Sequence, residues 1–529
     1  MTKTYPRWFF ILIFSGLLVL FYIFPLDQRI NSLGDDFAQY IQHAQNISHG
    51  YPYNNLPYLY NPEAPISPPV YPPIYPLLIS PLTFSQTPPY FWIKAVSVLL
   101  FLLTLPVLYQ IFRSLSGISL VKETLLLYTI IPWVVFGGRD IVAEPPYIFF
   151  SVLALWSLMT LPGNRLAVVP ALLTGLCMAL AALTRDIGLA LWGGSVLFYS
   201  YKIWKNPPQR SIALFQIIIL SFTFLIPVFL WNWYQNEMGL GPVNKIYFQI
   251  SLGLNNLSFN GLVLRFISNL YYYSQKGYEL LFPLSYILHP VPYLNWLRFP
   301  LTALILFILL WQMIKGLRGS AMPILLYISG FLGILLLLDF PMRAGVRYII
   351  PLAPFLTFFL LKGVKEFFSY FGRPASSYLY KIFLIFWIGL SIWGSGYFLF
   401  SSQSPLFSAA SPENPAYRTT ISWIRKELPE DCRIAYIKPR YLALYSHKPT
   451  VIPTLTKPPN QIINQLSCWK VTHVLLDDHF LKEESSLRKA LHQSPHFFSP
   501  LYTYPPLSLF TFKGPTCLTG DILPSSGEN

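Results

Sequence analysis

The stretch that decides the fold is WFFILIFSGLLVLFYIFPL, residues 8–26, which contains no charged side chain. A helix of this length matches the apolar core of a bilayer, about 30 Å thick, because each residue adds about 1.5 Å. Lys3 and Arg7 precede the stretch, and no cleavage site of small residues follows it. We therefore expect a retained membrane span and not a signal peptide.

The rest of the chain is also rich in apolar residues. Of its 529 residues, 54% are hydrophobic and only 11% are charged, against about 25% charged in an ordinary soluble domain. This composition excludes a water-soluble fold. With the first stretch included, about eleven runs are apolar enough for spans, although several are short or interrupted by proline. The further runs are residues 89–112, 123–136, 145–161, 166–184, 187–203, 212–234, 299–313, 322–338, 348–361 and 382–400.

The chain is basic, with 37 Lys and Arg against 22 Asp and Glu and a formal net charge of +15. In a soluble protein this excess would suggest nucleic acid as a partner, but the cytoplasmic loops of membrane proteins also collect Lys and Arg. Loops that hold Arg113, Lys205 and Lys315 fall on the side of the N-terminus. We therefore predict a multi-pass protein of the plasma (inner) membrane with a cytoplasmic N-terminus and no nucleic-acid partner. Loops 27–88 and 235–298 and the residues after 401 are then extracytoplasmic.

The long apolar runs stop before the C-terminal part of the chain. We predict a polytopic all-α membrane domain over residues 1–403 and a small extracytoplasmic α/β domain over residues 404–529. The second domain holds Cys432, Cys468 and Cys517, which allow at most one disulfide among three pairings. Its expected elements are helices at 417–428 and 480–491, buried strands at 433–437 and 471–476, and a hairpin of 501–504 with 507–512.

An acidic pair follows the first span in Gly34-Asp35-Asp36-Phe37-Ala38-Gln39-Tyr40. The spacing predicts a helix that runs to about Ser48 and ends at Gly50, with Phe37, Ile41 and Ala44 on one apolar face along the membrane surface. The pair could simply cap the helix and favour its dipole. A cap needs one aspartate, however, and two beside a bilayer indicate a functional site.

A second acidic site lies in Gly137-Gly138-Arg139-Asp140-Ile141-Val142-Ala143-Glu144-Pro145-Pro146, a short turn in which Pro145 or Pro146 can begin the next helix. Asp140 and Glu144 could divide the roles of base and cation ligand. The alternative is a weak surface ion pair between Arg139 and Asp140.

A cationic site lies in Arg343-Ala344-Gly345-Val346-Arg347-Tyr348-Ile349-Ile350-Pro351-Leu352-Ala353-Pro354, which enters the tenth span from outside. Arg347 can bind two phosphate oxygens with its planar guanidinium. The alternative is that Arg347 reaches lipid headgroups. Arg185 is expected to pair with its neighbour Asp186 in a tight turn.

In these motifs the chain resembles the GT-C superfamily of integral-membrane glycosyltransferases, which includes the protein mannosyltransferases and the aminoarabinose transferase of lipid A. The resemblance covers most of residues 1–400. It rests on the acidic pair with Tyr40 and Gly50, on Tyr71-Pro72-Pro73-Ile74-Tyr75-Pro76 before the second span, on Glu144-Pro145 before the fourth, and on Arg347-Tyr348 with Pro351 and Pro354.

The resemblance implies an enzyme that moves a sugar from a polyprenyl-phosphate donor to the hydroxyl of a lipid, glycan or protein acceptor at the extracytoplasmic face, with inversion. Membrane lipids would be further partners. In that role Asp35 or Asp36 would be the base, and Glu144 or Asp140 would assist it or hold a cation. Arg347 would grip the donor phosphate, with Arg139 and Arg343 as alternatives. Some relatives bind a divalent metal ion, for which Glu63 and His289 are the nearest analogues here.

Two other classes of protein have boundary charges of this kind. A transporter or lipid flippase is the main alternative, and a non-catalytic assembly or sensor protein is the other. The sequence shows no repeat of two halves, no charges near the middle of its spans and no Walker motif for energy coupling. These observations favour the transferase.

Overall fold

The computed structural model describes residues 7–26, 35–64, 68–85, 89–161, 167–205, 207–244, 258–282, 298–338, 345–372, 375–400 and 414–517. Contacts divide the chain into two compact units. Unit 1 consists of Met1–Asp27, Phe91–Trp231 and Leu252–Ser401, and unit 2 of Gln28–Tyr90, Asn232–Ser251 and Ser402–Asn529. The first predicted external loop therefore groups with the C-terminal residues, while folding of 1–403 and 404–529 as two domains stays a prediction.

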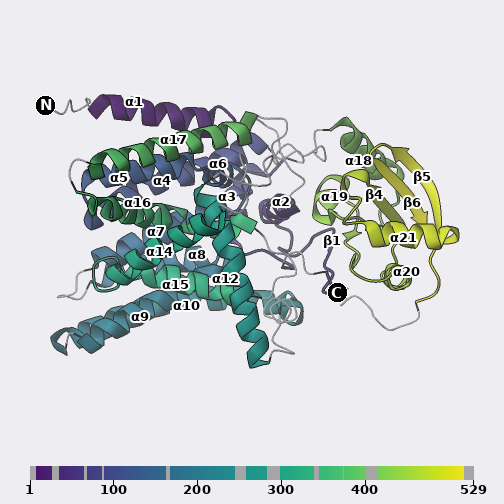
Figure 1. The fold of residues 1–529 in the computed structure, drawn as a ribbon. Coiled ribbons are helices and arrows are strands. Elements are labelled where there is room, and N and C mark those ends of the chain that lie inside the picture. The colour runs from purple at the N-terminus through teal and green to yellow at the C-terminus, as the bar shows by residue number, and fades with distance from the viewer. Residues whose placement is uncertain are drawn as a thin grey trace. The chain divides into compact units, whose positions relative to one another are not determined.

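Unit 1 is a bundle of helices (Figure 1). Residues 348–352 of the run 348–361 lie in the 3-10 helix Gly345–Leu352, and the described residues of the other predicted spans lie almost entirely in the helices of this bundle. They are α1 (Arg7–Leu18) with the π-helix Val19–Ile23, α4 (Tyr90–Leu115), α5 (Ile118–Ile130), α6 (Pro132–Arg139), α7 (Glu144–Thr160), α8 (Val168–Ala182), α9 (Leu189–Lys205), α10 (Arg210–Glu237), α12 (Phe259–Leu281), α14 (Arg298–Gly316), α15 (Met322–Leu337), α16 (Ala353–Ser369) and α17 (Ala375–Phe400).

Five helical segments among the described residues are long and apolar enough to cross a membrane by themselves, namely Tyr90–Leu115, Pro207–Glu237, Phe299–Gly316, Gly345–Ser369 and Ala375–Phe400. A sixth follows if α5 and α6, bent by 68° at Ile131, count as one. Others are shorter: the 17 residues of α7 reach only about 26 Å at about 1.5 Å per residue. The chain is thus a multi-pass membrane protein, and the number of crossings stays a prediction.

One helix of unit 1 differs from the expectation. The segment 235–298 was predicted as an external loop, but α12 forms a helix of 23 residues within it. Ser258 caps this helix by accepting a hydrogen bond from the backbone N–H of Gly261. The helix carries Arg265, Lys276 and Glu279, so its sequence is less apolar than a typical span and the hydropathy pattern did not reveal it.

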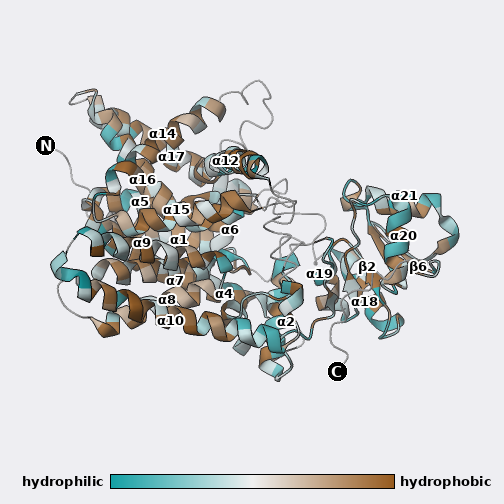
Figure 2. Cartoon of the chain, turned by 90° about the horizontal axis from the view of Figure 1, so that it is seen from below, coloured by the Kyte–Doolittle hydropathy of each residue, from teal (hydrophilic) through white to brown (hydrophobic). Residues whose placement is uncertain are grey.

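The core of unit 1 is a large cluster of buried apolar residues, and its helices are largely brown, the colour of hydrophobic residues (Figure 2). Trp387, Tyr128 and Tyr147 are fully buried in it. Helices α8 and α10 approach closely at Gly175, where a Cβ atom would lie 2.5 Å from the carbonyl oxygen of Leu220. Glycine is required there, because any side chain would force the two helices apart.

Unit 2 contains a six-stranded sheet in the order β1-β3-β2-β4-β6-β5. The first four strands in this order are parallel and the last two pair antiparallel. All the elements expected in the C-terminal part have a counterpart, and the hairpin is confirmed. The elements are α18 (Pro415–Glu427), β2 (Ile434–Ala435), α19 (Pro439–Ser446), β3 (Thr450–Val451), α20 (Pro459–Cys468), β4 (His473–Asp477), α21 (Ser485–Gln493), β5 (Phe498–Tyr504) and β6 (Leu507–Phe512). A disulfide joins Cys468 to Cys517 and leaves Cys432 as a buried thiol.

The first predicted loop completes this sheet. Its strand β1 (Tyr58–Leu59) pairs in parallel with β3, and the Asn61 amide donates to the carbonyl oxygen of Ile452 at 2.8 Å. The loop also forms α2 (Asp35–His49) and α3 (Ile74–Ile79), and α2 packs against both α3 and α19. Consequently α2 is held by residues about 400 positions away in the chain.

Candidate active site

The acidic pair begins α2, as the sequence predicts. The helix runs from Asp35 to His49, and Gly50 ends it with a φ of +72°, a conformation that costs glycine little. Phe37, Ile41 and Ala44 are buried, but Tyr40 and His43 are buried as well. The helix is therefore enclosed on two faces, whereas we expected a single apolar face.

An arginine from the C-terminal part of unit 2 lies on the acidic pair. Arg440, in the first turn of α19, is 2% exposed. Its Nη1 lies 3.1 Å from Oδ1 of Asp36, and its Nε lies 3.6 Å from Oδ2 of Asp35. Arg440 Nη1 also donates to Gln39 Oε1 at 3.3 Å and to the Tyr71 hydroxyl at 2.9 Å.

Tyr71 connects Asp36 and Arg440 in one hydrogen-bonded network. Its hydroxyl donates to Oδ1 of Asp36 at 2.8 Å, so one carboxylate oxygen is held by a phenol and a guanidinium together. The Tyr71 backbone N–H donates to Nε2 of His43 at 3.2 Å, and Nδ1 of His43 contacts the carbonyl oxygen of Tyr53 at 2.9 Å. His43 is thereby a neutral ring with its proton on Nδ1, and burial lowers its pKa to about 3.

The two aspartates differ in their surroundings. The Asp35 side chain is 3% exposed, and the Arg440 guanidinium and the backbone N–H of Tyr441 approach its carboxylate. Burial raises the pKa of Asp35, which the nearby cations Arg440 and Lys438 partly oppose. The Asp36 side chain is 27% exposed. Of the pair, Asp36 is the carboxylate that a molecule outside the protein can reach.

Sequence reasoning named both aspartates but missed Arg440. Tyr71 was noticed only as part of a Tyr-Pro-Pro motif. No local signal identifies Arg440, because it lies in a short helix, Pro439–Ser446, whose sequence resembles no motif. Its contact with α2 exists only through the folding of unit 2.

A second cluster lies within unit 1 around Glu144, the first residue of α7. Pro145 and Pro146 occupy the first turn of α7, as predicted. Glu144 is fully buried and ion-paired with two arginines: its Oε1 lies 2.5 Å from Nη1 of Arg185 and 2.5 Å from Nε of Arg347. Arg347 Nη2 adds a contact of 3.3 Å to Oε2. Arg185, which we expected to pair with its neighbour Asp186, lies in the turn after α8 and also contacts Glu144.

Two other predicted site residues make contacts of their own in unit 1. The helix α6 ends at Arg139 and α7 begins at Glu144, so Asp140 lies in a non-helical link, where its Oδ1 accepts from the N–H of Ile141. Arg139 is 6% exposed and donates to the carbonyl oxygen of Pro25 at 3.2 Å. Arg343 lies outside the described residues, as does His289.

Glu63, the other residue considered for a metal ion, contacts the C-terminal part of unit 2. Its Oε2 lies 2.5 Å from Nζ of Lys457 and accepts from Nε2 of Gln465 at 2.6 Å. Among the described residues, no group of three His, Cys, Asp or Glu side chains is placed to hold a metal ion. Metal binding stays a prediction.

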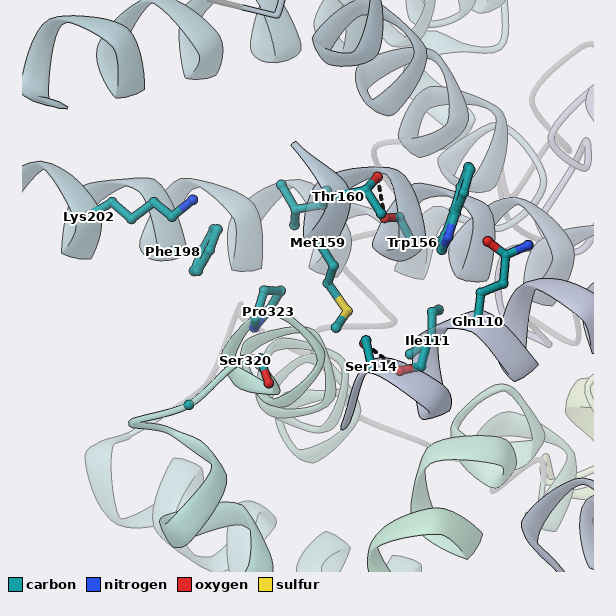
Figure 3. A pocket seen from close by; sticks show the side chains of 12 residues that line it. Gln110, Ile111, Ser114, Trp156, Met159, Thr160, Phe198, Lys202, Ser320 and Pro323 are labelled. Carbon is teal, nitrogen blue, oxygen red and sulfur yellow. Dashed lines mark hydrogen bonds between the residues drawn. The ribbon is translucent and has the colours of Figure 1, made fainter. Parts of the chain in front are cut away.

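Unit 1 also contains a pocket of about 230 Å³ that none of the predicted site residues line. Figure 3 shows Lys202 and Phe198 from α9 beside Met159 and Trp156 from α7, with Ser320 on the link before α15. Since its lining differs from both clusters, this pocket is a separate feature of the bundle.

The family model of dolichyl-phosphate-mannose-protein mannosyltransferases matches residues 37–240, a range that includes most of α2 and all of α7. Among curated proteins, none matches this sequence significantly.

Solved structures share the fold along most of the chain. ArnT from Cupriavidus metallidurans bound to undecaprenyl phosphate has a TM-score of 0.54 and 12% identity, and the match covers 96% of this chain and 98% of that one. The apo state of the same protein has a TM-score of 0.55 and 12% identity, covering 95% and 97%. The archaeal oligosaccharyltransferase AglB from Archaeoglobus fulgidus, in complex with an inhibitory peptide and a dolichol-phosphate, has a TM-score of 0.52 and 14% identity, covering 94% and 74%. At these identities the likeness concerns the fold.

The resemblance drawn from the acidic pair, the Tyr-Pro-Pro motif, Glu144-Pro145 and Arg347-Tyr348 is confirmed by the family model and the shared fold together. Over residues 37–240 the chain is similar to the dolichyl-phosphate-mannose-protein mannosyltransferases, and along most of its length it shares the fold of ArnT and AglB.

Proposed function

We propose that this protein transfers a sugar from a polyprenyl-phosphate donor to an acceptor hydroxyl at the extracytoplasmic face, with inversion. The observation that carries the proposal is the carboxylate of Asp36, which is 27% exposed while Tyr71 and Arg440 hold one of its oxygens in place. The undecaprenyl phosphate bound to ArnT and the dolichol-phosphate bound to AglB support the choice of donor.

The reaction needs one base and one group that stabilises a departing phosphate. Asp36 takes the proton of the acceptor hydroxyl, and the acceptor oxygen attacks the anomeric carbon opposite the phosphate. A new carbon–oxygen bond forms as the bond from the anomeric carbon to the phosphate oxygen breaks. The electron pair leaves with the polyprenyl phosphate, and the anomeric configuration is inverted.

We assign the donor phosphate to Arg347. Its side chain is 27% exposed although it is paired with Glu144, and a guanidinium can contact a carboxylate and a phosphate with different N–H groups. Arg139 is less suited, since it is 6% exposed. Asp140 or Glu144 as an assisting group, and Glu63 or His289 as ligands of a divalent cation, remain further parts of the proposal.

For the topology we propose about eleven spans, a cytoplasmic N-terminus and an extracytoplasmic α/β domain. Two observations support this orientation. Basic residues concentrate in the loops on the N-terminal side. The disulfide between Cys468 and Cys517 suits an oxidising compartment. A reporter fused after Pro412 tests the orientation, and activity there of a reporter that works only in the cytoplasm would contradict it.

The base is tested by incubating purified Asp36→Asn protein with a panel of polyprenyl-phosphate sugars and measuring the release of polyprenyl phosphate. Loss of a general base costs about 100- to 10,000-fold in turnover. Asp431→Asn, the same change at an exposed position of unit 2, is the matched control and is expected to keep full turnover. Full turnover in Asp35→Asn, Asp36→Asn and the double variant would exclude the base and favour a transporter or flippase instead.

Donor binding is tested with a labelled polyprenyl phosphate. Arg347→Ala is expected to weaken binding about ten- to a hundredfold, because a charge-assisted hydrogen bond contributes roughly 1.5 to 3 kcal/mol. Arg347→Lys keeps the charge near Glu144 and should restore binding only in part. If lysine restored binding completely, contact with lipid headgroups would explain Arg347 better.

A further inference from the structure

The contact between Arg440 and the acidic pair has a consequence for the chemistry of the site. Asp35 and Asp36 are neighbours in one helical turn, and two adjacent carboxylates resist being ionised together. Burial adds to this resistance at Asp35, whose side chain is only 3% exposed. A base has to be ionised before it can take a proton, so the pair needs a permanent cation beside it.

Arg440 supplies this cation in a form that cannot dissociate at working pH. It lies within 3.6 Å of both carboxylates and is itself 2% exposed, so the charges interact with little screening by water. The acidic pair in turn raises the pKa of Arg440 further, against the effect of burial. The three charges therefore form one interdependent group.

The contacts of Arg440 also determine how the carboxylate of Asp36 is oriented. One nitrogen, Nη1, contacts Asp36, Gln39 and the Tyr71 hydroxyl, while Nε faces Asp35. Burial raises the pKa of Tyr71 well above its usual value, so its hydroxyl stays a donor to Asp36. Oδ1 of Asp36 is consequently held from two sides.

Other titratable and charged groups around the network come from every neighbouring element. Burial keeps the nearest ring, His43, neutral, with a pKa of about 3. Further described groups that interact with the network are Tyr40 on α2, Tyr58 on β1, Lys438 before α19 and Tyr441 within it.

We propose that Arg440 is a positioning residue that keeps Asp36 ionised beside Asp35 and orients Asp36 as the base, so that residues of the C-terminal part complete the candidate active site. This inference rests on the proposed function, since it takes Asp36 as the group that accepts the proton. It goes beyond that function by making turnover depend on a residue about 400 positions from the base.

The experiment is the pH profile of kcat/KM for sugar transfer by the full-length protein. In Arg440→Gln the acidic limb, which follows ionisation of the base, is expected to move up by roughly 1 to 3 pH units. A shift of one unit lowers the rate about tenfold on that limb, and turnover recovers at higher pH. Arg425→Gln, on the exposed face of α18, is the matched control and should leave the profile unchanged.

Two further variants distinguish the effect of the charge of Arg440 from the effect of its planar guanidinium. Arg440→Lys keeps the cation but loses the planar fork, so the acidic limb should stay near its original pH while kcat falls. In Arg440→Gln with Asp35→Asn the repulsion within the pair is gone, and the acidic limb should move back. A role for Arg440 in packing alone predicts an equal loss at every pH and no recovery in the double variant.

The outcomes also separate this inference from the proposed function. Full turnover in Asp36→Asn would overturn the function and the inference together. An inactive Asp36→Asn combined with an unshifted profile in Arg440→Gln would overturn only the inference. If Arg440→Gln failed to fold, unchanged kcat and KM in Arg440→Lys would overturn it equally.

Discussion

Replacing Glu144 by glutamine tests whether this residue acts mainly as a structural counter-ion. Glu144 is fully buried and lies 2.5 Å from a nitrogen of Arg185 and 2.5 Å from one of Arg347. Glu144→Gln removes the negative charge that the guanidiniums of Arg185 and Arg347 both contact. Removal of one partner from a buried ion pair costs about 3 to 5 kcal/mol, because the remaining charge loses its compensation.

The exposure of the two arginines narrows the expected loss in the free energy of unfolding. The side chains of Arg185 and Arg347 are 16% and 27% exposed, so water solvates part of each charge. Glutamine also keeps one oxygen that can accept a hydrogen bond. We therefore expect a loss at the lower end, about 3 kcal/mol in the free energy of unfolding. The measurement is denaturant unfolding of the detergent-solubilised protein at pH 7.

Glu366→Gln is the matched control in unit 1. Glu366 pairs with Lys315 at 2.9 Å, but the two side chains are 36% and 50% exposed. An exposed pair contributes about 0 to 1 kcal/mol, so this variant should unfold close to the wild type. Addition of Arg185→Gln to Glu144→Gln should recover part of the loss, since it removes one of the two cations that contact position 144. Equal stability of Glu144→Gln and Glu366→Gln would refute the role of Glu144 as a structural counter-ion. Loss of turnover in Glu144→Gln at normal stability would instead favour Glu144 as a group that assists the base or holds a cation.

Three further predictions concern unit 2. His43 is protonated near pH 6.5 in the unfolded chain but only near pH 3 in the folded chain. The free energy of unfolding should therefore fall as the pH drops below 6.5, by up to about 1.4 kcal/mol per pH unit. His43→Gln should remove this pH dependence, measured by hydrogen exchange of α2. Burial raises the pKa of Glu484 to about 8. The free energy of unfolding should therefore fall as the pH rises from about 4.5 through 8. At pH 9, Glu484→Gln should unfold at a higher denaturant concentration than the wild type. The disulfide between Cys468 and Cys517 closes a loop with a sequence separation of 49, and its reduction should destabilise unit 2 by about 2 to 4 kcal/mol in denaturant unfolding. Equal unfolding with and without reductant would contradict the last expectation.

Local features of the structure could be predicted from the sequence because their causes are local. An apolar run satisfies its own backbone in a helix, so the predicted runs became α4, α10 and α17 with small shifts at the ends. Gly50 ends α2 through its own backbone conformation, and Pro505 and Pro506 separate the two strands of the hairpin. In each case the residues that decide the outcome are neighbours in the chain.

Contacts between distant segments could not be predicted in this way. Strand β1 has two residues and exists only because β3 offers it a partner. Arg440 has no motif around it, and its role follows from the packing of α19 on α2. The pairing of Glu144 with both Arg185 and Arg347 likewise joins three helical ends that the sequence treats separately.

The balance of charge in the two clusters argues for a division of tasks between them. Within unit 1 two guanidiniums, those of Arg185 and Arg347, contact one carboxylate, Glu144. Within unit 2 the guanidinium of Arg440 contacts two carboxylates, Asp35 and Asp36, and Lys438 is a further cation near Asp35. Neighbouring guanidiniums favour an anion such as a phosphate, and an exposed carboxylate favours removal of a proton. Variants of Arg347 should therefore alter donor affinity, and variants of Asp36 should alter turnover while donor affinity is retained.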